Sequence, residues 1–138
     1  MISTRGRYAL RMMIDLAERQ GEGFVALKEI AESQDISKKY LEQIIPLLNR
    51  SGLLLTSRGV TGGYRLAKAP EEYTVGEILR SAEGSMAPVS CLEGETNDCP
   101  RCGKCDTLPI WEGLQAVVDQ YLDGISLADI LRSKTEKI

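Results

Sequence analysis

Residues 27–66 read LKEIAESQDISKKYLEQIIPLLNRSGLLLTSRGVTGGYRL, and this stretch decides the fold of the 138-residue chain. Leu27, Ile30 and Ala31 recur at the i, i+3, i+4 spacing of one buried helical face. A second stripe of leucine and isoleucine follows a short turn, and two short strand patterns then flank a glycine-rich loop. This order predicts a helix-turn-helix followed by a β-hairpin wing.

The second of these helices has a polar face that suits DNA. It carries Lys38, Lys39, Glu42 and Gln43, and Ser37 is placed to cap the first turn. In a helix-turn-helix, the N-terminal residues of the second helix meet base edges in the major groove. Gln43 can form two hydrogen bonds with adenine, and Glu42 can accept one from cytosine. The two lysines suit phosphates, so we expect this face to read DNA.

The same helix contains one local conflict. Pro46 lies inside it, where proline removes a backbone donor at a cost of about 3 kcal/mol. We therefore expect either a kink or packing that tolerates the proline. Gly52 follows the helix and is expected to end it in a left-handed conformation.

The wing is expected from strands at residues 53–57 and 63–66. The loop between them begins with Arg58 and Gly59, and its glycines allow the positive φ angles of a tight turn and a close approach to DNA. Arg58 is free to enter a minor groove. Interaction modules that never touch DNA can also contain two helices and a hairpin, so the pattern alone leaves that reading open.

The charge distribution favours DNA binding by one half of the chain. Net charge is −3, but residues 1–68 hold 11 Lys/Arg against 7 Asp/Glu, whereas residues 69–138 hold 6 against 13. The basic half contains the helix-turn-helix. The chain has no histidine, which removes histidine catalysis and histidine metal ligation. No apolar run approaches the ~20 residues of a membrane helix, and we expect a cytoplasmic protein with no membrane partner.

Four further helices are expected outside this stretch. One runs from a Ser3-Thr4 cap to about Arg19, and another from a Thr74 cap to about Glu83, where residues 74–77 match a capping box. A long helix at residues 107–123 has an apolar stripe formed by Ile110, Leu114, Val117, Val118, Tyr121 and Leu122. Such a stripe supplies a dimer interface or covers the helix's own core. After the fourth helix, capped by Ser126, we expect a frayed tail from Ser133.

All four cysteines lie in one loop, with the spacing Cys91-x7-Cys99-x2-Cys102-x2-Cys105. Clustering of every cysteine in an irregular segment indicates metal ligation. Thiolates bind both iron–sulfur clusters and zinc, and four of them can close a zinc tetrahedron. A thiol–disulfide switch is a third alternative, and a plain surface loop is the fourth. Spacing alone does not separate iron from zinc.

Together these residues resemble the IscR/NsrR/CymR family of bacterial winged-helix transcription regulators, in its cysteine-containing branch. The resemblance is carried by residues 2–9, 36–43 and 58–64, by the cysteine loop and by Trp111. It implies a mainly α fold with a small β-wing, that is, a winged helix-turn-helix plus a long C-terminal dimerisation helix. It also implies a homodimer that binds a pseudo-palindromic double-stranded DNA operator.

The resemblance assigns roles to individual residues. Tyr40, Glu42 and Gln43 match positions that touch DNA, and Arg58 matches the wing arginine that enters the minor groove. The ligands of an iron–sulfur cluster, 2Fe–2S or 4Fe–4S, match three of the cysteines: Cys91, Cys99 and Cys105.

This chain departs from the family at the fourth ligand. Cys91 and Cys99 are spaced more widely than in IscR, whose histidine ligand aligns near Leu108. NsrR-type members use an N-terminal aspartate where this chain has Tyr8. Cys102 is therefore the first candidate for the fourth ligand, with Asp106 or a residue of the partner subunit as alternatives.

These observations lead to one expected organisation and one leading function. We expect a single regulator domain over residues 1–138, with the winged helix-turn-helix at 1–83, the cysteine loop at 84–106 and the dimerisation helix and tail at 107–138. We expect a transcriptional repressor that senses redox state, nitric oxide or iron–sulfur status. The alternative is a winged-helix regulator with a structural zinc or a thiol switch, controlled by a protein partner or a small effector, as in cysteine metabolism. No acid–base pair or phosphate loop is evident, so we expect no enzyme.

Overall fold

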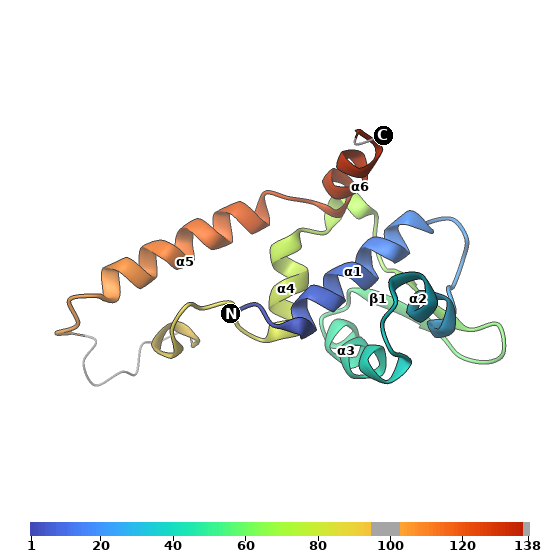
Figure 1. The fold of residues 1–138 in the computed structure, drawn as a ribbon, viewed down its shortest axis with the longest axis horizontal. Helices are drawn as coiled ribbons and strands as arrows, with labels where there is room; N and C mark the ends of the chain where they lie inside the picture. Colours follow the sequence, from blue (N-terminus) through green and yellow to red (C-terminus); the bar gives the residue numbers. More distant parts are fainter. Residues whose placement is uncertain (95–102, 137–138) are drawn as a thin grey trace.

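The computed structural model describes residues 1–94 and 103–136 (Figure 1). Its elements are α1 (Thr4–Glu18), α2 (Leu27–Gln34), α3 (Lys38–Arg50), β1 (Leu54–Ser57), β2 (Gly63–Leu66), the 3-10 turn η1 (Pro70–Glu72), α4 (Val75–Glu83), the 3-10 turn η2 (Ser90–Leu92), α5 (Leu108–Asp123) and α6 (Leu127–Glu136). The mainly helical fold with a two-stranded antiparallel wing is confirmed. Among these helices, none is long and apolar enough to cross a membrane.

The helix-turn-helix forms through local caps. Asp35 adopts a left-handed φ of 54° between α2 and α3, and the Ser37 hydroxyl accepts a hydrogen bond from the Tyr40 N–H at 3.1 Å. Helix α3 then continues to Arg50 past Pro46, whose side chain is exposed. Because the proline faces solvent, water can reach the backbone carbonyl that loses its helical partner. Gly52 has a φ of 72°, which confirms the predicted left-handed end.

The wing is anchored to the turn between α1 and α2. Strands β1 and β2 pair from Leu54 with Leu66 to Ser57 with Gly63, and Val25 adds one antiparallel bridge to Tyr64. A Cβ at Gly63 would lie 2.2 Å from the Val25 carbonyl oxygen, so only glycine permits this approach. The Val25 bridge therefore joins the wing to the segment between α1 and α2.

The core surrounds α1, which packs against α2, α3, α4, α6 and β2. Its buried face includes Met12, Met13 and Leu16. Tyr73 is fully buried and ties the base of the wing together: its hydroxyl donates to the Leu53 carbonyl at 2.6 Å and accepts from the Ala67 N–H at 2.8 Å. Burial is the main cause that raises the pKa of Tyr73, so the phenol stays protonated.

Two expectations for the later helices need correction. Thr74 caps α4 as predicted, accepting from the Glu77 N–H at 3.0 Å, but the Glu77 carboxylate pairs with Lys68 at 3.1 Å instead of closing a capping box. The expected frayed tail from Ser133 is also wrong, since α6 runs to Glu136. An ion pair between Lys134 and Glu18 attaches this last turn to α1.

Candidate nucleic-acid interface

Helix α3 divides into a buried apolar face and an exposed polar face. The buried residues are Leu41, Ile44, Ile45 and Leu48. The exposed residues include Lys38, Lys39, Glu42 and Gln43, the same four that the periodicity assigns to the DNA side. The 100° per residue of an α-helix explains the division, because residues three and four apart return to one side.

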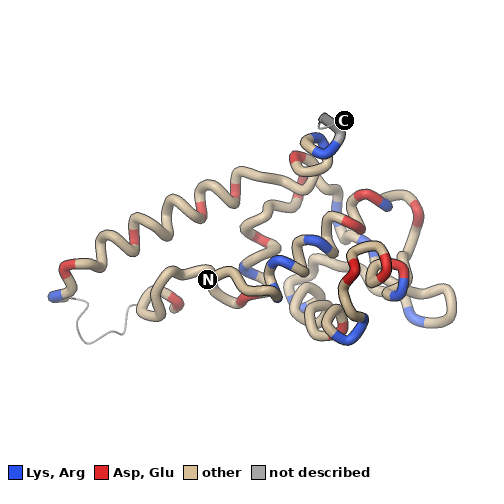
Figure 2. The backbone as a smooth tube through the Cα atoms, viewed as in Figure 1, with Lys and Arg blue, Asp and Glu red and all other residues tan. Residues whose placement is uncertain are grey.

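The lysines of this face have no acidic partner among the residues that the structure describes. In the part of the chain that the structure describes, ion pairs within 4.0 Å involve Arg5, Arg19, Lys68, Arg80, Arg132 and Lys134. Lys38, Lys39 and Arg58 are absent from these pairs and exposed. Figure 2 shows basic residues on α3 and the wing, whereas α5 carries only acidic ones. Unneutralised cations on one exposed surface are what phosphate binding requires.

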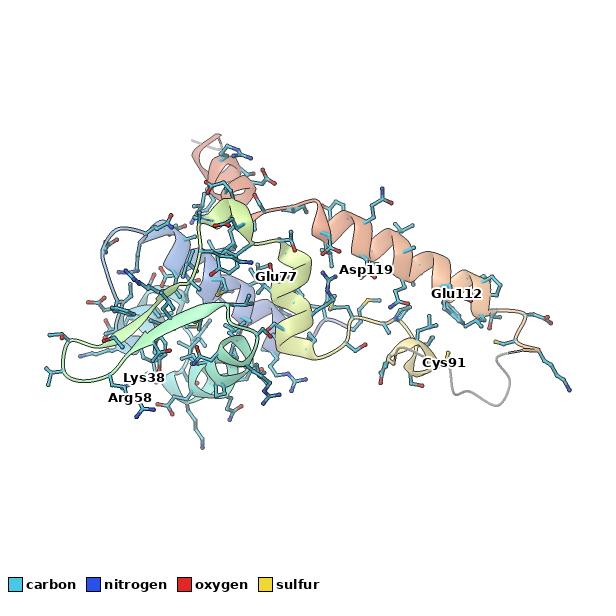
Figure 3. All side chains as sticks on the ribbon, turned by 180° about the vertical axis from the view of Figure 1, so that it is seen from behind. Lys38, Arg58, Glu77, Cys91, Glu112 and Asp119 are labelled. Carbon is cyan, nitrogen blue, oxygen red and sulfur yellow. The ribbon has the colours of Figure 1, made fainter. Side chains whose placement is uncertain are left out.

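The wing loop brings a further basic residue to the same side of the molecule. Figure 3 shows Lys38 on α3 and Arg58 on the loop between β1 and β2, both on the side away from α5. Gly59 has a φ of 105°, and a Cβ at Gly62 would lie 2.3 Å from the Ser57 carbonyl oxygen. These glycines fold the loop tightly, and they leave Arg58 free to extend outward.

Tyr40 differs from the other predicted DNA contacts because its ring is half-buried. It meets the Tyr8 ring edge-on, with centroids 5.2 Å apart and planes at 70°. The Arg11 guanidinium lies 5.2 Å from the Tyr8 ring centroid and donates a hydrogen bond to the Gln34 carbonyl. The structure therefore places Tyr40 in the packing between α1 and α3. Sequence reasoning missed Tyr8, which joins the first turn of α3 to α1.

The N-terminus of α1 is tied to the end of α4 by Glu83. The Ser3 hydroxyl donates to a Glu83 carboxylate oxygen at 2.6 Å, the Ser3 N–H donates to the other, and Arg5 lies 3.6 Å away. Burial raises the pKa of Glu83, but the hydrogen bonds from Ser3 and the charge of Arg5 outweigh it and lower the pKa below its ordinary value. Of the three N-terminal arginines, only Arg7 has an exposed side chain that forms no hydrogen bond or ion pair within the described residues.

The described parts of the cysteine loop, residues 84–94 and 103–106, follow α4 and precede α5. Cys91 in η2 (Figure 3) and Cys105 are both half-buried. The Cys105 sulfur lies 3.3 Å from the Thr107 hydroxyl oxygen. The predicted ligands Cys99 and Cys102 lie outside the described residues. Over residues 1–94 and 103–134, no group of three His, Cys, Asp or Glu side chains is placed to hold a metal ion. The two described thiols fit the donor type of an iron–sulfur cluster and supply half of a four-thiolate set.

Helix α5 shows a second apolar surface. None of its 16 residues is buried, and its exposed large apolar residues are Ile110, Leu114, Val117 and Tyr121. Their 4-3-4 spacing forms one continuous stripe. Val118 and Leu122, which the sequence placed on the same stripe, are half-buried and lie on the side toward the rest of the chain. The structure thus divides the predicted stripe into two faces.

Comparison with known proteins gives concordant results. The model of the Rrf2 family, described as an iron-dependent transcriptional regulator, matches residues 2–133. The protein rrf2 of Nitratidesulfovibrio vulgaris is 39% identical over 131 residues, which are 95% of this chain and 87% of that protein. The solved structure of T. potens IscR matches with a TM-score of 0.78 at 39% identity, over 99% of this chain and 90% of that one. The structure of CymR, the global cysteine regulator of B. subtilis, matches with a TM-score of 0.74 at 37% identity, over 94% and 95%.

Proposed function

The chain belongs to the Rrf2 family of DNA-binding transcriptional regulators, and we propose that it is a cytoplasmic homodimeric repressor whose DNA binding responds to an iron–sulfur cluster. Its signal is redox state, nitric oxide or cluster supply. The observation that carries DNA readout is the surface of α3 and the wing, where exposed cations have no acidic partner in the described structure.

The proposed readout uses three kinds of contact. Gln43 and Glu42 read base edges in the major groove, because their side chains are exposed on the first two turns of α3. Lys38 and Lys39 contact phosphates, and Arg58, with the backbone at Gly59, enters the minor groove. Tyr40 contributes mainly by holding α3 against Tyr8.

The proposed dimer is held by the exposed stripe of α5. Fully burying a large apolar side chain contributes about 1.5–3 kcal/mol, and the stripe offers four of them to a second copy. Two-fold symmetry then presents two α3 helices to two half-sites of a palindromic operator.

The proposed cluster ligands are Cys91, Cys99 and Cys105, with Cys102 as the fourth and Asp106 or a residue of the partner subunit as alternatives. When bound, a cluster supplies a centre whose charge and ligation change on oxidation, nitrosylation or loss of iron. The Cys105 carbonyl accepts a hydrogen bond from the Leu108 N–H at 3.3 Å, so ligation of Cys105 bears directly on the first turn of α5. Ordering this loop would therefore act on the dimer helix.

A second candidate function keeps the regulator and replaces the cluster. A zinc ion or a thiol switch would also use the four cysteines, and CymR, whose structure is similar, is the global cysteine regulator of B. subtilis. Anaerobic purification followed by an absorbance spectrum and analysis of iron, sulfide and zinc separates these alternatives. Iron with sulfide supports the cluster, whereas one zinc per chain or no metal with an oxidised thiol pair favours the second candidate.

DNA readout is tested with single substitutions on a selected operator. Gln43→Ala should cost about 1–3 kcal/mol and relax preference at the base it reads. Arg58→Ala should weaken binding through the minor groove, while Arg132→Ala on α6 is the matched control, an exposed arginine distant from α3. If Gln43→Ala and Arg58→Ala both bind as tightly as the unmodified chain, the proposed interface is wrong.

Coupling is tested by comparing cluster-loaded protein, cluster-free protein and a Cys91→Ala/Cys105→Ala variant on one operator at fixed salt. We expect the variant to behave like cluster-free protein, with helical content unchanged by circular dichroism. Typical couplings correspond to about 5–150-fold in affinity. Equal binding by all three proteins would mean that the cluster is structural and senses nothing.

A further inference from the structure

Helix α4 lies between the recognition helix and the dimer helix. On one side, the Ser81 hydroxyl donates to the Leu47 carbonyl of α3 at 3.1 Å and lies 2.8 Å from the Ser51 hydroxyl. On the other side, α4 packs against the C-terminal part of α5, which projects from the body of the molecule (Figure 1). Helix α4 thus contacts both α3 and α5. The relative position of these two helices matters for a dimer that binds DNA.

The contact between α4 and α5 centres on one arginine. Arg80 places one guanidinium nitrogen 2.6 Å from the Asp123 carboxylate and the other 3.5 Å from Asp119. The two aspartates are four residues apart, so they lie on one side of α5, and Figure 3 shows Asp119 directed toward α4. The Thr74 hydroxyl lies 3.5 Å from the same Asp123 oxygen.

The Asp123 carboxylate also lies close to the backbone of α4, which makes this contact specific. A Cβ at Gly76 would lie 2.1 Å from the Asp123 carboxylate oxygen, so the carboxylate sits directly over the helix backbone. Arg80, Asp119 and Asp123 are each about two-fifths exposed, and exposed ion pairs contribute little to overall stability. The contact is therefore better suited to hold an angle between two helices than to hold the fold.

We propose that Arg80, with Asp119 and Asp123, sets the spacing of the operator half-sites that the dimer accepts. This inference rests on the proposed dimerisation through α5. A 16-residue helix is about 24 Å long, so a tilt of about 10° at one end moves the other by about 4 Å. That displacement is close to the ~3.4 Å between successive base pairs. A fixed angle selects one spacing, and a loose angle accepts several.

The experiment uses full-length protein and double-stranded DNA. Two copies of the preferred half-site, found by selection with the unmodified chain, are joined by spacers that differ by one base pair. A duplex with a single half-site is measured in parallel. Arg80→Gln removes the charge and keeps a polar side chain, and Arg80→Lys restores the charge. Arg132→Gln is the matched control, since among the described residues Arg132 pairs only with Asp129 of its own helix.

We expect the unmodified chain to prefer one spacing by about tenfold or more, and Arg80→Gln to reduce that preference to about threefold or less. Arg80→Lys should recover part of the preference, and Arg132→Gln should retain all of it. Binding of Arg80→Gln to the single half-site and its dimerisation by sedimentation should be unchanged. A purely structural role for Arg80 would lower half-site binding together with the spacing preference.

Two results would overturn the proposal in different ways. If the unmodified dimer shows a spacing preference and Arg80→Gln keeps it, or if Arg80→Gln loses half-site binding, the role of Arg80 is wrong and the proposed function stands. If the unmodified chain is monomeric or ignores spacing, dimeric recognition fails, and the role of Arg80 fails with it.

Discussion

Helices α3 and α5 are both amphipathic, but only α3 has its apolar face covered by its own chain. Four of its 13 residues are buried, whereas none of the 16 residues of α5 is. A stripe of four exposed large apolar side chains is unfavourable in water, and contiguous patches of this kind mark interaction sites. The apolar face of α3 is therefore covered within one chain, while the exposed stripe of α5 is suited to contact a second surface.

The same two regions also differ in whether their basic side chains have acidic partners. Lys38, Lys39 and Arg58 have no acidic partner in the described part of the molecule, whereas Arg80 beside α5 meets two aspartates. An internal partner would have to be displaced before a cation met a phosphate. The proposed DNA-binding surface therefore keeps its cations available, and the junction between α4 and α5 uses its arginine within the fold.

The largest expected effect comes from placing a charge on the α5 stripe. Val117→Asp should convert a dimer into a monomer, because Val117 is 65% exposed in one chain and would be buried between two. Loss of the second half-site should lower operator affinity by about 100-fold or more. Sedimentation and operator binding measure both changes.

Ala116→Asp is the control, since Ala116 is exposed on α5 but lies off the stripe. It should leave the dimer and operator binding intact. A dimer that survives Val117→Asp would place the interface elsewhere.

The second prediction compares the two apolar faces directly, in the Val117→Asp monomer so that dimerisation does not contribute. Ile44→Ala should lower the free energy of unfolding by about 2–5 kcal/mol, because Ile44 is fully buried. Leu114→Ala should change it by less than about 0.5 kcal/mol, since Leu114 is exposed. Urea titration measures both values, and similar losses would contradict the contrast between the helices.

The third prediction concerns two tyrosines, one in each region. Tyr73→Phe should cost about 1–3 kcal/mol of unfolding free energy, because the Leu53 carbonyl and two backbone N–H groups lose a buried partner. Tyr121→Phe is the matched change on α5, where the tyrosine is 68% exposed, and should leave monomer stability unchanged. A neutral Tyr73→Phe would mean that the base of the wing is held by packing alone.

The smallest expected effect is a difference in acid stability. The folded-state pKa of Glu83 is lowered, so its contribution is fully present above the unfolded pKa of about 4.3 and is lost as pH falls through the folded value. The free energy of unfolding should fall as the pH drops below about 4.3, and Glu83→Gln should make this fall smaller by about 1 kcal/mol or less. Glu112→Gln, an exposed change on α5, should leave that fall as it is.

Much of the fold could be predicted because its signals are local. The caps at Ser37 and Thr74 and the left-handed Gly52 were predicted correctly, since each involves groups only a few residues apart. The exposed polar face of α3 followed from its 3.6-residue period for the same reason. The ion pair of Glu77 and the helical structure of the tail after Ser133 were not predicted correctly. Their partners, Lys68 and Glu18, belong to other parts of the fold.

The sequence predicted which residues make up the candidate site, but it predicted their spatial arrangement only in part. The sequence identified Lys38, Lys39 and Arg58, and the structure adds that none has an acidic partner among the described residues. The sequence did not indicate that Tyr40 packs on Tyr8, because these two rings are 32 positions apart and meet only when α1 and α3 are packed together. The assignment of all four cysteines to one metal site stays a prediction.

The sequence by itself determined the helix-turn-helix, the wing and the amphipathic character of α5, since side-chain period and capping act within one or two turns of the chain. Only the tertiary structure decided which half of the α5 stripe is exposed, that Glu83 closes the start of α1, and that Arg80 joins α4 to Asp119 and Asp123. These contacts join residues about 40 to 80 positions apart. Their formation depends on how whole helices pack, and no short-range pattern specifies that packing.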